Sequence, residues 1–209
     1  MIIKIQKHLS YFKSDFRGEL MQIFLIIKRK TKLFIFSPIT SISLWLNGVK
    51  SGSNNKFIGI PCVKRTPNSE IVIGSENEFL SSPTSNLIGI NRKCILSTQS
   101  EQAIIKIGDN CGFSGTVIGA FSTITLGDFV RCGANTLITD SDWHTDDPRV
   151  SESQPVVIKN NVWLGVNAVV LKGVTIGENT IIGANSVVVK SIPANVIAAG
   201  NPCKVIKQI

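Results

Sequence analysis

The sequence predicts an all-β protein built as a parallel β-helix, with a helical N-terminal segment and one long loop expelled from the coil. A six-residue repeat runs through the C-terminal half, residues 1–56 lack this repeat and are basic, and the repeat stops over residues 139–157. With 209 residues, 43% of them hydrophobic, the chain can bury the core of one domain. We therefore predict an N-terminal segment over 1–56 and a β-helix domain over 57–209.

The repeat is clearest from Ile158 onward, where the chain divides into hexads that begin with an aliphatic residue. These first positions are Ile158, Leu164, Val170, Ile176, Ile182 and Val188. A period of six fits a coil of three flat faces, one hexad to a face, with the aliphatic side chain pointing inward. Successive turns would then stack as parallel strands about 4.8 Å apart. The predicted pairs are Ile158 with Ile176, Leu164 with Ile182, and Val170 with Val188.

Two further positions of the hexad are also regular. Glycine follows the aliphatic residue at 165, 177 and 183, and the fifth position is mostly small or β-branched. We expect the glycines to permit the backbone conformations of tight corners, and the β-branched residues to favour short extended faces. Imperfect hexads that begin at Ile73, Ile107, Leu126 and Cys132 extend the coil toward the N-terminus.

The N-terminal segment carries most of the net charge of +8. Residues 1–36 contain eight Lys and Arg against two acidic residues. The apolar runs 20–27 and 33–46 are too short to cross a membrane but are suited to lying on one. Two interpretations stay open: a helical appendage packed on its own domain, and peripheral contact of residues 1–46 with an anionic membrane. No signal peptide and no nucleic-acid partner are expected.

The cysteines and histidines indicate the compartment and the absence of a metal site. The five cysteines are far apart in the sequence and form no CxxC pair, which favours a reducing cytoplasm over a disulfide framework. His144 is the one histidine of the repeat region, whereas a zinc hydratase would need about three histidine ligands per metal. We therefore predict a cytoplasmic protein without a bound metal. If residues 1–46 bind lipid, the protein would contact the inner face of the membrane.

The repeats resemble those of the hexapeptide-repeat acyltransferases, which fold as left-handed parallel β-helices. The resemblance covers about residues 57–209 and rests on four segments: 162–165 (VWLG), 173–177 (GVTIG), 182–190 (IGANSVVVK) and 200–207 (GNPCKVIK). The left hand is implied by the resemblance, because parallel crossovers are otherwise right-handed. Within the family, TDSDWH at 139–144 followed by DDP at 146–148 is most similar to enzymes that O-acetylate sugars of bacterial surface polysaccharides and lipopolysaccharide.

The resemblance implies an acetyl-CoA-dependent O-acetyltransferase in which His144 is the general base. A sugar hydroxyl must lose its proton as it attacks the thioester carbonyl, and a neutral imidazole can accept that proton and return it to the departing thiolate. Direct transfer needs no protein nucleophile, so no acyl-enzyme is expected. Asp142 lies two residues earlier, and in an extended segment it would project to the same side as His144. It could orient the imidazole, hold a sugar hydroxyl, or simply lie in a solvated loop.

The other predicted site residues follow from the same resemblance. Acetyl-CoA is expected between neighbouring subunits of a homotrimer. The predicted cofactor contacts are Trp163, Gly165, Val166, Gly183 and Ala184 along the pantetheine arm, Lys190, Lys204 and Lys207 near the phosphates, and Pro202 at the adenine. The glycines and Trp163 also fit structural roles in the repeat. The predicted acceptor contacts are Asp142, Trp143, Ser114 and Asn135, with Trp143 as either a sugar-stacking surface or a loop anchor.

The acceptor and the reaction leave alternatives open. Where the galactoside and maltose branch of the family binds its acceptor, this chain has Ser114, Gly115, Ala120 and Phe121, so simple galactosides are not expected. N-acetylation of a nucleotide-linked amino sugar and a non-catalytic β-helix scaffold are the other functions considered. Acceptors that offer a hydroxyl or an amine would separate the two reactions.

Overall fold

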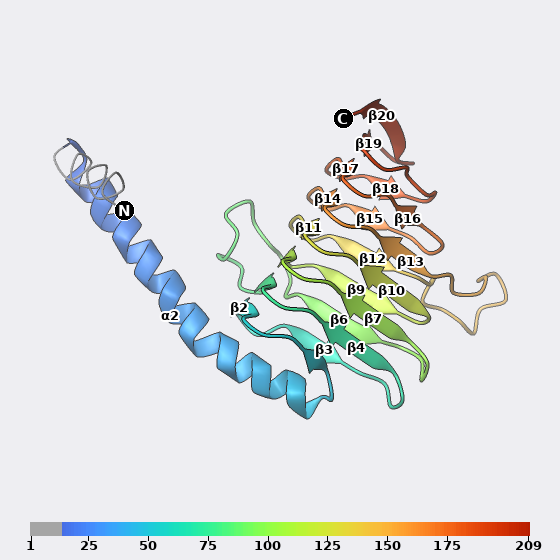
Figure 1. Ribbon diagram of the computed structural model, residues 1–209, viewed down its shortest axis with the longest axis horizontal. Coiled ribbons are helices and arrows are strands. Elements are labelled where there is room, and N and C mark those ends of the chain that lie inside the picture. Colours follow the sequence, from blue (N-terminus) through green and yellow to red (C-terminus); the bar gives the residue numbers. More distant parts are fainter. Residues whose placement is uncertain (1–13) are drawn as a thin grey trace.

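The computed structural model describes residues 14–209 as one long helix followed by a stack of short strands (Figure 1). Helix α2 spans Phe16–Leu46. The strands form three sheets that are the faces of a single coil, and all but the last strand pair in parallel. The predicted fold class is confirmed: a left-handed parallel β-helix with an N-terminal helix and an expelled loop.

Each strand lies beside its equivalent one turn earlier and one turn later. The first sheet contains β1 (Lys50–Ser51), β4 (Glu70–Ile73), β7 (Ile104–Ile107), β10 (Thr123–Leu126), β13 (Val156–Ile158) and β16 (Thr175–Ile176). The second contains β2 (Lys56–Ile58), β5 (Glu78–Leu80), β8 (Gly112–Ser114), β11 (Arg131–Cys132), β14 (Trp163–Leu164), β17 (Ile181–Ile182), β19 (Val196–Ala199) and β20 (Lys204–Gln208). The third contains β3 (Cys62–Lys64), β6 (Ile95–Thr98), β9 (Val117–Ala120), β12 (Leu137–Thr139), β15 (Val169–Val170) and β18 (Val187–Val188).

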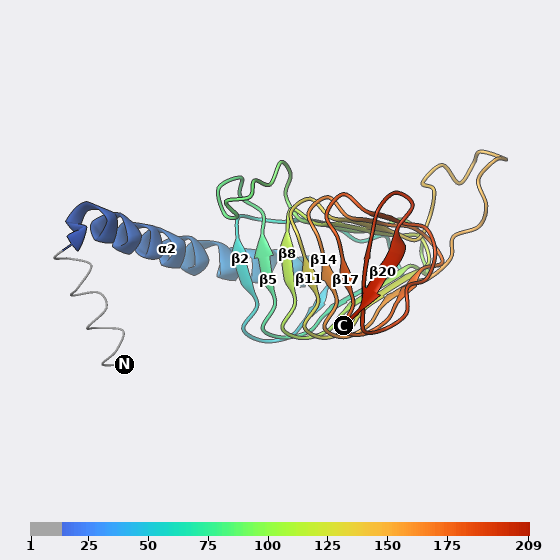
Figure 2. The same cartoon turned by 90° about the horizontal axis from the view of Figure 1, so that it is seen from above.

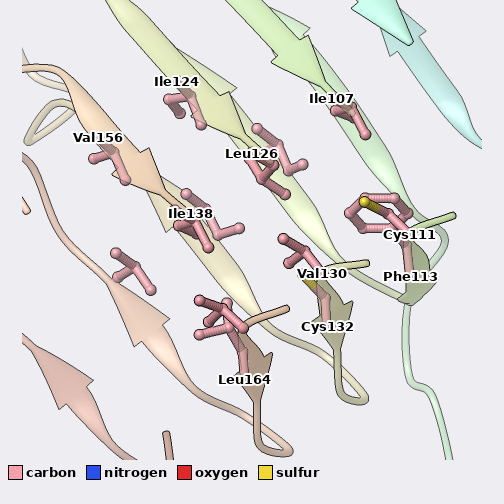
Figure 3. Close-up of a cluster of buried hydrophobic side chains, with 14 of the residues drawn as sticks. Ile107, Cys111, Phe113, Ile124, Leu126, Val130, Cys132, Ile138, Val156 and Leu164 are labelled. Atoms are coloured by element: carbon pink, nitrogen blue, oxygen red, sulfur yellow. The ribbon is translucent and has the colours of Figure 1, made fainter. Parts of the chain in front are cut away.

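The predicted stacking of the hexads is confirmed residue by residue. Ile158 pairs with Ile176, Leu164 with Ile182, and Val170 with Val188. All six first positions point into the coil and are at most 1% exposed, and Figure 3 shows how such side chains from successive turns stack in the interior. Three phenylalanines continue the stack of the second sheet, with ring centroids 5.1 and 4.7 Å apart: Phe57, Phe79 and Phe113.

The expected reason for the repeated glycines was wrong. Gly165, Gly177 and Gly183 do not have positive φ angles, and asparagines at the fourth hexad position do: Asn161, Asn167, Asn179 and Asn185. Asparagine tolerates the left-handed conformation better than most residues, so it turns the corners. The glycines are required by close packing, because a Cβ on Gly165 would lie 2.5 Å from the backbone nitrogen of Ala184 on the next turn.

Helix α2 covers the N-terminal end of the coil with its C-terminal half. Leu44 is 1% exposed and belongs to the core, and Phe36 packs against it. The Ser37 hydroxyl accepts a hydrogen bond from the Phe57 backbone N–H at 3.1 Å. The N-terminal half extends past the coil (Figures 1 and 2). The first strand of the coil begins at Lys50, before the predicted boundary at residue 57.

Two loops leave the coil at different corners. Residues 140–155 connect β12 in the third sheet to β13 in the first sheet, in agreement with the predicted interruption of the repeat. Residues 81–94 connect β5 in the second sheet to β6 in the third, and the sequence did not reveal this excursion. Figure 2 shows the two loops on opposite sides of the coil.

Candidate functional site

The loop that carries His144 is fastened to the coil at its first residue. The Asp140 side chain is fully buried, and its two carboxylate oxygens accept the backbone N–H groups of Phe121 at 2.7 Å and Ser122 at 2.8 Å. Burial raises the pKa of Asp140, and these N–H bonds oppose the rise. The Asp140 carbonyl also accepts the Gln154 N–H, which ties the two ends of the loop together. Sequence reasoning placed Asp140 in the loop without recognising this role.

Replacement of Asp140 by Asn should destabilise the fold without changing any residue in the exposed part of the loop. Asn keeps the shape but presents an NH₂ group to one of the two backbone donors, which leaves a buried N–H unsatisfied. We expect a loss of about 1–3 kcal/mol in the free energy of unfolding, measured by urea denaturation. An exposed aspartate of the same loop, Asp146, supplies the control, since Asp146→Asn should change the free energy by less than about 0.5 kcal/mol.

His144 itself lies at a tight turn near the outer part of the loop. Its backbone N–H donates to the Asp142 carbonyl at 3.0 Å, and Trp143 between them has a φ of +73°. Non-glycine residues rarely adopt this conformation, and a three-residue turn of this hand is strained. The imidazole is exposed, and it forms no side-chain hydrogen bond to any residue in the range 14–209. A free imidazole on a strained turn is available to an external reactant.

The structure corrects the expected position of Asp142. Because the segment turns at Trp143, Asp142 and His144 are not neighbours on an extended strand. The Asp142 carboxylate is bonded instead to the ammonium of Lys172 at 2.5 Å, and Lys172 also donates to the hydroxyl of Ser151 at 2.6 Å and to its carbonyl at 3.1 Å. Lys172 comes from the turn after β15, its side chain is 16% exposed, and it joins the two arms of the loop on either side of His144. Sequence reasoning missed this lysine because its partners lie 21 and 30 residues away.

Removal of the Lys172 ammonium should loosen the loop and leave the coil intact. In Lys172→Met, three hydrogen bonds to the loop are lost, and the hydrocarbon stem still fills its half-buried position. We expect proteolytic cleavage within residues 141–153 to become at least about tenfold faster, with the melting temperature shifted by a few degrees at most. Lys159→Met, at an exposed lysine outside the loop, should leave the cleavage rate unchanged.

Trp143 is anchored on the coil and still partly accessible. Its indole N–H donates to the Thr139 hydroxyl at 2.9 Å, and its ring packs edge-to-face on Phe121 with centroids 5.4 Å apart. A Cβ on Gly119 would lie 2.4 Å from the ring, so this glycine makes room for it. These contacts favour the loop-anchor interpretation, and 41% of the residue stays exposed.

A groove at the corner between the second and third sheets brings five predicted cofactor residues together. Its volume is about 410 Å³, and its lining includes Trp163, Gly165, Val166, Gly183 and Ala184. These residues lie at the ends of β14 and β17 and at the turns that follow them. Trp163 is 56% exposed, so it is a surface residue and not a core residue of the repeat. Apolar walls with open backbone suit an extended, mostly uncharged ligand arm.

The remaining predicted cofactor residues lie outside this groove, at the C-terminal end of the coil. Lys204 and Lys207 lie on β20, which continues the second sheet beyond β17 and β19. Pro202 lies in the turn between β19 and β20 and follows a cis peptide bond. Lys190 follows β18 in the third sheet. All four are exposed, so a ligand that follows the second sheet from the groove toward the C-terminus would reach a basic region.

Ser114 and Asn135 are covered by the loop 81–94 and hold it in place. Both are less than 9% exposed. The Asn86 side chain donates to the Ser114 hydroxyl at 3.0 Å, and the Asn91 N–H donates to the Asn135 side-chain oxygen at 3.0 Å. Their expected contact with an acceptor stays a prediction, which these contacts do not favour. The loop itself is the better candidate for ligand contact, since Asn86 and Ile88 line the groove.

A second, polar hollow adjoins the groove on the face of the second sheet. Its volume is about 450 Å³, and it shares Asn86, Gly133 and Trp163 with the groove. Charged side chains line it, among them Arg131 and the Arg29–Glu78 ion pair between α2 and β5. Sequence reasoning missed this hollow, because its residues come from the helix and from several different turns. Residues 14–209 contain no cluster of three or more His, Cys, Asp or Glu side chains suited to a metal.

His144 and the groove cannot form one site within a single chain. The loop 140–155 leaves the coil between the third and first sheets, whereas the groove lies between the second and third sheets. The whole third face separates these two corners. Figure 2 shows the loop 140–155 projecting from the coil on the side opposite helix α2. A reaction that needs both must therefore use the corners of two neighbouring chains.

Fold and groove define a hexapeptide-repeat β-helix, and comparisons with known proteins agree. The sequence model of the family described as bacterial transferase hexapeptide (six repeats) matches residues 155–190. This match, together with the two relatives described next, confirms the predicted resemblance to the hexapeptide-repeat acetyltransferases.

Two curated relatives from Escherichia coli strain K12 are sugar-related acetyltransferases by name. The chain is 43% identical to galactoside O-acetyltransferase over 111 residues, which cover 50% of this chain and 54% of the relative. It is 33% identical to a putative lipopolysaccharide biosynthesis O-acetyl transferase over 121 residues, which cover 51% of this chain and 62% of the relative. The chain thus spans about half to three-fifths of these relatives.

Among solved structures, a mutant of AntD, an N-acyltransferase from Bacillus cereus, aligns over 80% of this chain and 88% of its own with a TM-score of 0.56. At 20% identity this likeness shows the fold alone.

Proposed function

We propose that this protein is an acetyl-CoA-dependent O-acetyltransferase that acts on a sugar hydroxyl of a surface polysaccharide, of lipopolysaccharide or of a precursor. The observation that carries the proposal is the groove at which Trp163, Gly165, Val166, Gly183 and Ala184 converge. Its apolar walls fit the pantetheine arm, and the exposed Lys204 and Lys207 further along the second sheet fit the phosphates. The two Escherichia coli relatives support acetyl transfer to a sugar.

In this proposal His144 is the general base. Its exposed imidazole takes the proton of the acceptor hydroxyl as the oxygen attacks the thioester carbonyl. The C–S bond then breaks, and the imidazolium returns the proton to the thiolate of coenzyme A. The turn at Trp143 and the Lys172 bonds hold the histidine in place, so the protein contributes position and proton transfer and forms no covalent intermediate.

The active assembly is proposed to be a homotrimer. Because His144 and the groove occupy different corners of the coil, each site would combine the loop of one subunit with the groove of the next. A threefold arrangement of a three-sided coil places such corners against each other and gives three equal sites. Sedimentation equilibrium should report three times the mass of the chain, and a fully active monomer would contradict the arrangement.

The acceptor is tested by offering paired substrates. We expect acetyl-CoA and a polysaccharide or lipid-linked oligosaccharide with free hydroxyls to give an acetyl ester, detected by mass spectrometry and removed by mild base. An amide product from a nucleotide-linked amino sugar would instead support the N-acetyltransferase alternative, and the absence of coenzyme A release with either acceptor would support a scaffold. Surface glycans from cells with and without the protein would then identify the natural acceptor.

We propose a cytoplasmic location for this reaction, at the inner face of the membrane. The five unpaired cysteines fit a reducing compartment. No helix within residues 14–209 has the length and apolar character needed for a membrane span.

A further inference from the structure

Helix α2 presents an apolar stripe to the solvent on the side away from the coil. Leu33, Phe36, Thr40 and Leu44 form the side that faces the coil. The opposite side bears seven large apolar residues at helical spacing, each between 45% and 83% exposed: Phe16, Leu20, Phe24, Ile27, Phe34, Ile42 and Trp45. Six further exposed apolar residues of the helix lie outside this stripe: Met21, Leu25, Ile26, Ile35, Ile39 and Leu46. A surface helix ordinarily places polar residues on the side away from its domain. An exposed stripe of this size marks a contact surface.

The charges of α2 lie on both sides of this stripe. The helix has five basic residues and one acidic residue, Glu19, which is 5% exposed. Lys28 and Lys30 are two residues apart and so lie about 200° apart around the helix, one on each side of the stripe. The Lys28 ammonium is 6.0 Å from the centroid of the Phe24 ring, which places it along the stripe's edge. Apolar residues between two basic edges are typical of helices that lie in a membrane interface.

We propose that the outer face of α2 binds the surface of an anionic bilayer, with the helix axis in the membrane plane. The seven apolar side chains would enter the acyl boundary, and Lys28 and Lys30 would remain among the phosphates. At about 1.5 Å per residue the helix is about 46 Å long, so it can hold the attached coil at the bilayer. This surface works independently of acetyl transfer, and its test does not need an acceptor.

Charge favours a lipid occupant over a second copy of the helix. Residues 28–32 contain four basic residues and no acidic residue, and they lie near the middle of α2. If two copies met through their stripes, in either parallel or antiparallel orientation, these basic segments would face each other. Anionic headgroups neutralise the same charges without any loss of apolar contact.

The experiment measures binding of the full chain to vesicles by flotation. Wild-type protein should bind vesicles of phosphatidylglycerol with phosphatidylcholine, bind phosphatidylcholine alone much more weakly, and lose binding as salt is raised. Ile27→Asp with Phe34→Asp should raise the lipid concentration for half-binding at least about tenfold. Lys28→Gln with Lys30→Gln should raise it more than about tenfold for the anionic vesicles only. The matched control is Ile209→Asp, an exposed apolar residue at the opposite end of the coil.

Three results would overturn the proposal. These are failure of the wild-type chain to bind anionic vesicles, unchanged binding by the Asp variants, and a change in sedimentation mass of those variants without lipid, which would assign the stripe to a second copy. If the melting temperature shows that the Asp variant is unfolded, the test rests on the Lys28→Gln with Lys30→Gln variant, because both of its substitutions are at exposed positions. His144→Ala should bind vesicles as the wild type does, so failure of the proposed activity and failure of this proposal remain distinguishable.

Discussion

His144→Ala should lower the rate of acetyl transfer by about 10²- to 10⁴-fold while the protein remains folded. The side chain is exposed and holds no other described residue, so its removal leaves the buried contacts of the loop in place. The Asp140 and Lys172 bonds persist, and the turn at Trp143 does not depend on the imidazole. Coenzyme A release in the presence of the acceptor gives the rate, and thermal unfolding reports the fold.

The matched control for this prediction is Thr145→Ala, at the next exposed position of the same loop. It should keep the rate within about twofold of wild type. Unchanged transfer by His144→Ala would remove the histidine from the mechanism. An equal loss in both variants would mean that the loop geometry, and not the imidazole, had been damaged.

Ala184→Phe should close the groove and raise the KM for acetyl-CoA by more than about tenfold. Ala184 is exposed, so the added ring extends into the groove and not into the core. The same hexad position on the corner between the first and second sheets is Glu178, which is exposed as well. Glu178→Phe therefore adds the same ring to another edge of the same turn and should leave the KM unchanged.

Mixing the two defective proteins tests whether each site uses two subunits. If His144 and the groove come from neighbouring chains, mixed oligomers of His144→Ala and Ala184→Phe contain some sites with both parts intact. Co-refolded mixtures should therefore recover a substantial part of the wild-type rate, which neither variant shows alone. No recovery, with mixed oligomers shown to form, would place both parts of the site in one chain.

Much of the fold could be predicted from the sequence because the hexad repeats in register with the coil. A fixed inward position every six residues determines which side chains are buried and which turns stack, as the pairing of Ile158 with Ile176 shows. The groove residues were assigned from the resemblance to the hexapeptide-repeat acyltransferases, and the register of the hexads explains why they converge. Positions such as Gly165 and Gly183 are equivalent in successive turns, so they necessarily lie side by side at one corner.

The contacts around the loop could not be predicted, because they join residues that no period relates. Lys172 holds Asp142 and Ser151 from the next turn of the coil, and Asp140 reaches back to Phe121. The residues 81–94 interrupt imperfect hexads, so their excursion left no clear break in the pattern. The outer face of α2 was likewise undecided, since both of its sides are apolar in the sequence.

By itself the sequence determined the three-sided coil, its register and the expelled loop, because each depends on local spacing along a periodic chain, while the family resemblance singled out His144 within that loop. Only the tertiary structure decided that the histidine and the groove occupy different corners, that Asp142 bonds to a lysine, and which side of the helix faces solvent. Those outcomes depend on the direction in which each segment leaves the coil, and that direction is set by packing between residues distant in the sequence.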